Sequence, residues 1–131
     1  MRHIRVLIAG VFLFAAALPS LLCAEGIEMY NYSELLVENL SIGNEYSMVK
    51  LVNLPLKIKN QDQNTNKVKF DVVVPAKQEL REGFDKIPDT SWIKVMPTEA
   101  EIGPGEVYST DVVISIPDDT KHLGEKYQVG I

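Results

Sequence analysis

Oxygen-bearing side chains follow one another around Asp62, in a stretch of the chain that is wholly polar. Asp62, Asn64 and Asn66 have the one-three-five spacing at which a calcium loop presents its ligands. Such a loop also requires a glycine directly after the third ligand and a bidentate glutamate further on. Lys67 and Val73 occupy these two positions instead. The sequence therefore predicts a solvated hairpin loop here, and we expect no metal cofactor.

A second group of carboxylates comprises Asp111, Asp118 and Asp119, which together could hold a cation. However, a proline followed by two aspartates, as at Pro117, also favours a turn. We expect the turn that ends the preceding strand.

His122 is the only histidine beyond residue 24. It has no cysteine or carboxylate at metal-ligand spacing, and no nucleophile elbow accompanies it from which a Ser-His-Asp triad could be built. We expect His122 to lie in a surface loop, and we expect the chain to have no catalytic residues and no cofactor.

Trp92 allows two interpretations. If it is exposed, its ring could stack on a sugar or anchor a protein partner. If it is buried, it is a core residue at the beginning of a strand. The sequence favours the core but leaves both open.

Residues 1–24 have the composition of an export signal. Arg2 and Arg5 give a positive start, an apolar run follows, and Ala24 is a small residue suited to cleavage. We expect a signal helix that is cleaved after Ala24, and a location in the periplasm or at the cell surface.

Two membrane attachments remain as alternatives. Extended through Leu22, the apolar run approaches the ~20 residues of a spanning helix, so an uncleaved signal could anchor the chain. Cys23 could carry a lipid anchor, although a lipid-attachment signal has a small residue where Leu22 stands. We expect membrane contact only through one of these two routes.

Cleavage would leave 107 of the 131 residues, which suits one domain. It removes Arg2 and Arg5 but no acidic residue, so the net charge changes from −5 to −7. An acidic domain does not suit the phosphates of nucleic acid. The single cysteine, Cys23, leaves with the signal, so packing must stabilise the fold without disulfides. We expect a flexible leader over residues 25–34 and one domain over residues 35–131.

Apolar and polar residues alternate along most of this domain, which is typical of strands with one buried face. The polar loop around Asp62 separates two alternating runs, residues 54–59 and 67–74, and the pair predicts a hairpin. A loop with an optional helical turn at residues 77–81 follows. The other expected strands are residues 35–42, 46–52, 92–95, 107–116 and 127–131.

The order of these segments resembles the immunoglobulin-like β-sandwich modules of bacterial exported proteins, including the domain beside glycosidase catalytic units and related adhesion-type domains. The matching segments are Leu56–Asn60 and residues 91–93, 102–106, 112–117 and 124–127. The resemblance implies an all-β Greek-key sandwich of about seven strands, preceded by the signal helix. It implies a fold rather than an activity.

Tyr127 stands at the start of the last alternating segment. In the resembling modules this is the place of a tyrosine corner, whose hydroxyl bonds to the backbone a few residues upstream. An ordinary core-facing tyrosine is the alternative. If Tyr127 opens the penultimate strand, the final strand is missing. The chain is then either a piece of a longer protein or a sheet that accepts a strand from another chain, as pilus chaperone systems do.

We therefore expect a non-catalytic, exported binding or assembly module of the cell envelope that acts through protein–protein contact. Its partner would be another envelope protein or further domains of its own longer chain. The expected contact residues are Trp92, Tyr127, Val129 and Ile131. The alternative is an accessory domain of a longer secreted carbohydrate-active enzyme, in which Trp92 would meet a glycan.

Overall fold

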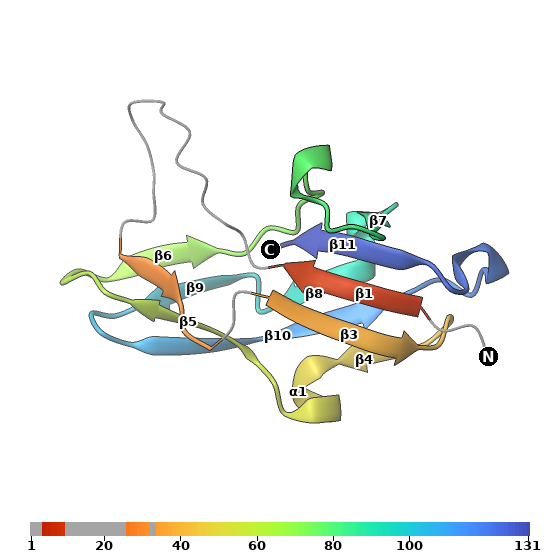
Figure 1. Ribbon diagram of the computed structural model, residues 1–131. Coiled ribbons are helices and arrows are strands. Elements are labelled where there is room, and N and C mark those ends of the chain that lie inside the picture. Colours follow the sequence, from red (N-terminus) through yellow and green to blue (C-terminus); the bar gives the residue numbers. More distant parts are fainter. Residues whose placement is uncertain (1–3, 10–25, 32–33) are drawn as a thin grey trace.

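The computed structural model describes residues 4–9, 26–31 and 34–131, which form strands joined by short helical turns (Figure 1). One short α-helix, α1 (Met48–Val52), and three 3-10 turns, η1 (Lys77–Glu79), η2 (Thr90–Trp92) and η3 (Thr120–His122), interrupt them. The strands are β1 (Ile4–Ala9), β2 (Ile27–Met29), β3 (Glu34–Leu40), β4 (Glu45–Ser47), β5 (Leu56–Asn60), β6 (Asn66–Lys69), β7 (Asp85–Lys86), β8 (Ile93–Met96), β9 (Glu99–Ile102), β10 (Val107–Ser115) and β11 (Lys126–Gly130).

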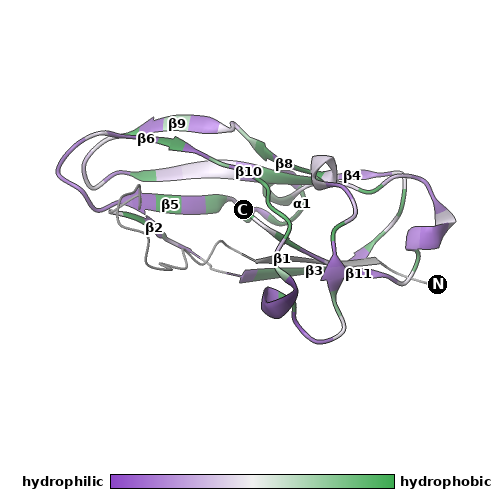
Figure 2. Cartoon of the chain, turned by 90° about the horizontal axis from the view of Figure 1, so that it is seen from above, coloured by the Kyte–Doolittle hydropathy of each residue, from purple (hydrophilic) through white to green (hydrophobic). Residues whose placement is uncertain are grey.

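The strands of the described residues pair into two larger sheets and a two-stranded ribbon. The first sheet has the order β2-β5-β10-β4, and β8 also pairs with β10. The second has the order β3-β1-β11-β7, and β6 pairs with β9 as a two-stranded ribbon. Seen from above, the layer of β1, β3 and β11 is separate from the layer of β8 and β10 (Figure 2). The prediction of an all-β sandwich is confirmed.

The long strand β10 lies inside the first sheet, between β5 and β4, and the second half of its sequence is apolar. Val112 and Ile114 are fully buried, as is Val129 of the opposite layer. Antiparallel partners cover β10 along its length: β5 pairs with its first half, and β8 and β4 with its second half. The core between the layers is therefore made of the alternating residues that the sequence indicated. Val72, which lies outside the strands, is partly buried against the same core.

The predicted hairpin between residues 54–59 and 67–74 is wrong. Strand β5 pairs with β2 and β10, whereas β6 pairs with β9. The cause lies at Asn60, where β5 ends. The Asn60 N–H donates to the Glu106 carbonyl (3.0 Å), and the Asn60 carbonyl accepts from the Gly105 N–H (2.8 Å). These bonds hold β5 to the turn before β10, so the chain leaves for the ribbon instead of folding back on β5.

The strand predicted over residues 46–52 is also wrong beyond Ser47, because α1 begins there. The Ser47 hydroxyl accepts a hydrogen bond from the Lys50 N–H (3.1 Å), and the Asp111 carboxylate accepts one from the Val49 N–H (3.0 Å). Asn53, with φ of 52°, ends the helix in the left-handed conformation. A cap supplied by a distant aspartate thus overrides the strand preference of the two valines.

The N-terminal segments differ from expectation in two places. The leader predicted over residues 25–34 contains β2, which pairs with β5. Residues 4–9, within the predicted signal helix, form strand β1 in the second sheet. The rest of the predicted signal, including the cleavage position at Ala24 and the lipid-anchor candidate Cys23, lies outside the described residues. Within the described ranges, no helix has the length and hydropathy needed to cross a membrane.

Candidate strand-acceptor site

Strand β1 lies between β3 and β11 and completes the second sheet (Figure 1). It runs parallel to β11, with five residue pairs from Arg5↔Lys126 to Ala9↔Gly130. It runs antiparallel to β3, with a register shift between Ile4 and Val6. A segment from the far N-terminus therefore separates the first strand of the main domain from its last.

The other edge of β11 is already filled. Strand β7 pairs with β11 in parallel, and the Ile87 N–H donates to the Gln128 carbonyl (3.2 Å). Further along, Val73 and Gly130 exchange two backbone hydrogen bonds of 2.8 and 2.9 Å. Since alternate peptide groups of a strand point to opposite edges, the peptide groups of Val129 face β1. Strand β1 is thus the only described partner of β11 on that edge.

The inner face beside β1 is apolar. In β11, Tyr127 is 6% exposed and Val129 is fully buried, and Ile131 is partly buried against the core. In β3, Leu35 and Val37 are partly buried against the same core. Three predicted contact residues, Tyr127, Val129 and Ile131, therefore lie on or directly after the strand that adjoins β1.

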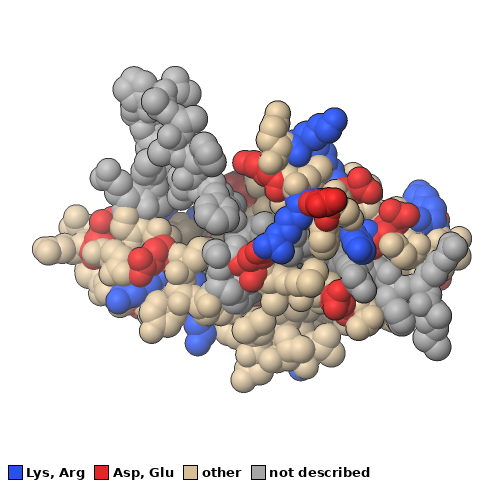
Figure 3. Space-filling model, viewed as in Figure 1, with Lys and Arg blue, Asp and Glu red and all other residues tan. Residues whose placement is uncertain are grey.

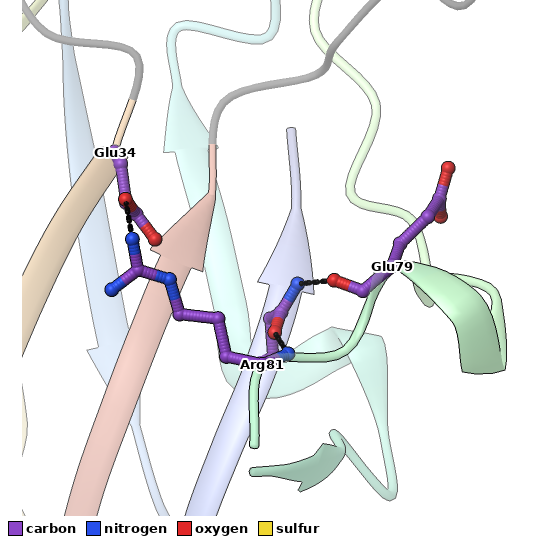
Figure 4. A network of polar contacts seen from close by, with 4 residues as sticks. Glu34, Glu79 and Arg81 are labelled. Carbon is purple, nitrogen blue, oxygen red and sulfur yellow. Dashed lines mark hydrogen bonds and ion pairs between the residues drawn. The ribbon is translucent and has the colours of Figure 1, made fainter.

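A polar network covers the outer face of the same position (Figure 4). The Gln128 side chain accepts from the Arg81 N–H and donates to the Glu79 carbonyl, both at 2.8 Å. The Arg81 guanidinium forms an ion pair with Glu34 on β3, with 2.5 Å between Nη2 and Oε2. Figure 4 shows the Arg81 side chain extending across the ribbon of β1 to reach Glu34. Arg81 therefore links β11 to β3 over the strand between them.

An aromatic cluster closes one end of β11. The rings of Trp92, His122 and Tyr127 meet edge to face, with centroids 4.7 to 5.9 Å apart. Trp92 is 8% exposed, so of its two interpretations the core position is confirmed. The prediction that His122 lies at the surface is wrong, because His122 is 5% exposed and its ring meets the indole of Trp92 edge to face.

The hydroxyl of Tyr127 gives the buried His122 a hydrogen-bond partner. Its oxygen lies 2.8 Å from His122 Nδ1, so the two side chains share a hydrogen bond. A tyrosine corner would bond to the backbone instead, and here the partner is a side chain five residues upstream. Burial raises the pKa of Tyr127, and the nearby carboxylates of Glu125, Asp85 and Asp119 act in the same direction.

The two candidate cation groups serve as structural polar contacts. The Asn66 amide donates to both Asp62 (2.8 Å) and Asn60 (3.0 Å). These two hydrogen bonds close the polar loop whose spacing is similar to that of a calcium loop. The Lys121 ammonium lies 2.8 Å from the Asp119 carboxylate, which also accepts from the Lys121 N–H (3.1 Å), and these two contacts lower the pKa of Asp119. Asp111 instead bonds to Ser47 and Val49 at α1. Among the described residues, no three His, Cys, Asp or Glu side chains come together as a metal site.

Charges of both signs are mixed on the face that contains β1 (Figure 3). An uncharged area lies at the lower centre of this view, where Figure 1 places α1. Leu51 and Val52 of this helix are each 57% exposed. On this face, the described residues do not gather charges of one sign into a site for an ionic ligand.

Comparison of the chain with protein-family models, with curated proteins and with solved structures finds no match. The site therefore has to be interpreted from its own geometry. Sequence reasoning identified β11 but missed Arg81, Glu34 and Gln128, whose partners are 47 or more residues away in the chain. The β-branched residues Ile4, Val6 and Ile8 within the predicted signal were the available sign of a strand there.

Proposed function

We propose that the protein is an exported, non-catalytic immunoglobulin-like module that acts through protein–protein contact, and that the contact is made at the β1-facing edge of β11. One observation carries this proposal: the strand between β3 and β11 belongs to residues 1–24, which the sequence predicts to be removed after export. In the chain that remains, the edge of β11 would lack its strand.

An unfilled position of this kind favours association. The backbone groups of β3 and β11 would lose their hydrogen-bond partners, and the apolar surface around Val129 would lose its cover. A strand from another protein restores both at once, which is the physical basis of recognition by strand addition. Contact with a glycan is less favoured, because Trp92 is buried and offers no open ring face.

The proposal can be tested in the envelope of the source cell. A photo-crosslinking residue at Leu36, which is 49% exposed beside the β1 position, should give covalent adducts with another polypeptide after export. The same residue at Lys94, an exposed position on β8 in the other layer, serves as the control. Adducts from position 36 and none from position 94 support the proposal. No adduct from position 36, or equal adducts from both positions, would refute it.

A further inference from the structure

We infer that the position between β3 and β11 is a binding site for an extended segment that runs parallel to β11 and has apolar residues at two alternate positions, and that residues Ile4–Ala9 occupy it until residues 1–24 are removed. The inference rests on the proposed function. It adds the direction in which the partner strand runs, the positions at which that strand has apolar residues, and the segment of this chain that competes with it. In this scheme the precursor is closed by its own N-terminus, and cleavage opens it.

The register defines which residues the site requires. Position 6 of β1 is paired with Tyr127 and Val37, and position 8 is paired with Val129 and Leu35. Side chains of paired residues lie on the same face of a sheet, and these four partners belong to the core or pack against it. Positions 6 and 8 therefore require apolar residues, and the sequence has Val6 and Ile8 there.

Position 7 meets a different environment. It is paired with Gln128 and Leu36, on the opposite face of the sheet. Leu36 is half exposed, and Gln128, although only 4% exposed, is polar and hydrogen-bonded to Arg81 and Glu79. The site should therefore tolerate a polar or charged residue at position 7. This difference between neighbouring positions gives the test its matched control.

The Arg81–Glu34 ion pair encloses one end of the site. Glu34 and Gly130 are the two register partners of Ala9, and Arg81 is anchored to Gln128 of β11. The guanidinium thus reaches from β11 to β3 over the carboxyl end of the bound strand (Figure 4). An incoming segment has to pass beneath this pair or displace it. We expect Arg81→Ala to speed strand exchange without removing the site.

The full chain can be used directly if a specific protease sequence replaces residues 19–24. After cutting, β1 is held only by non-covalent contacts and can be exchanged for a labelled synthetic peptide with the sequence of residues 2–10 and added terminal lysines. We expect the peptide to bind the cut chain and not the uncut chain. Aspartate at position 6 or 8 of the peptide should weaken binding by about tenfold or more, whereas aspartate at position 7 should weaken it by less than about threefold.

The direction of the bound strand is tested by disulfide formation. In a cut chain carrying Lys126→Cys, whose natural Cys23 is already removed with residues 19–24, a peptide with cysteine at position 5 should cross-link, because Arg5 and Lys126 are paired. A peptide with cysteine at position 9 should not, since position 9 is paired with Gly130. Cross-linking from position 9 alone would show the reverse direction and overturn the inference.

Three other outcomes would also overturn it. Equal binding to cut and uncut chains would place the peptide elsewhere. Equal effects of aspartate at positions 6, 7 and 8 would contradict the register. A cut chain that dimerises and then excludes the peptide would show that a second copy fills the position. The proposed function can fail independently, because the envelope cross-linking experiment asks for a natural partner and the peptide experiment does not.

Discussion

At the residue scale, the aromatic cluster beside β11 shows how few polar atoms this core contains and how closely they are paired. His122 and Tyr127 are both buried, and each is the hydrogen-bond partner of the other. His122 looked like a surface residue because its neighbours in sequence are polar. Its burial depends on Trp92, thirty residues upstream, whose ring lies against the imidazole. Local sequence does not reveal a contact of this range.

Removing the Tyr127 hydroxyl should destabilise the fold. Tyr127→Phe keeps the ring but leaves His122 Nδ1 buried without its partner, which should lower the free energy of unfolding by about 1–3 kcal/mol. Urea denaturation of the full chain measures the loss. Tyr30→Phe is the control, because Tyr30 is 55% exposed and its change should stay within about 0.5 kcal/mol. Equal stability of the two variants would contradict the assignment.

The same residue predicts how stability depends on alkaline pH. Burial raises the pKa of Tyr127 above its usual value of 10.0, so the folded chain keeps this proton at a pH where the unfolded chain has lost it. Folding stability contributed by Tyr127 is therefore fully present below pH 10 and falls as the pH rises through the raised pKa. We expect unfolding curves of the natural chain to lose more stability than those of Tyr127→Phe as the pH rises above 10. Parallel losses in the two chains would be inconsistent with this burial.

At the element scale, alternation in the sequence predicted faces correctly but not partners. It identified β10, whose residues Val112 and Ile114 point into the core as expected. It also identified β5 and β6 as strands, yet it assigned them to each other. The hydrogen bonds that decide their pairing involve Asn60 and the turn before β10, more than forty residues away. The Asp111 carboxylate that accepts a hydrogen bond at the start of α1 is still more distant, 62 residues along the chain from Val49.

The two faces of β3 offer a prediction at this scale. Val37 packs against the core, so Val37→Asp should lower the free energy of unfolding by about 2 kcal/mol or more. Leu36 is half exposed on the outer face, so Leu36→Asp should cost less than about 1 kcal/mol. Thermal and urea unfolding of the two full-length variants distinguish them. A larger loss for Leu36→Asp would mean that β3 has the opposite register.

At the scale of the whole molecule, the sandwich has one sheet whose strands all lie after the predicted cleavage position and one sheet that incorporates a segment from the predicted export signal. The sequence anticipated an open edge beside residues 127–131 but placed the N-terminal residues in a helix. The apolar run that suits a signal also suits a buried strand, because both environments select the same residue types. Composition alone therefore does not distinguish the two states of this segment, and the structure places residues 4–9 in the sheet.

The most direct test of strand acceptance compares amide hydrogen exchange at Val129 and Gly130. The Val129 N–H faces β1, whereas the Gly130 N–H donates to the Val73 carbonyl (2.9 Å) on the other edge. When β1 is displaced from the cut chain, we expect exchange at Val129 to accelerate about 100-fold while Gly130 changes by less than about tenfold, and added peptide to restore protection. If Val129 stays protected without β1, or if both amides lose protection together, the folded chain has no open strand-binding position between β3 and β11, and the proposal is wrong.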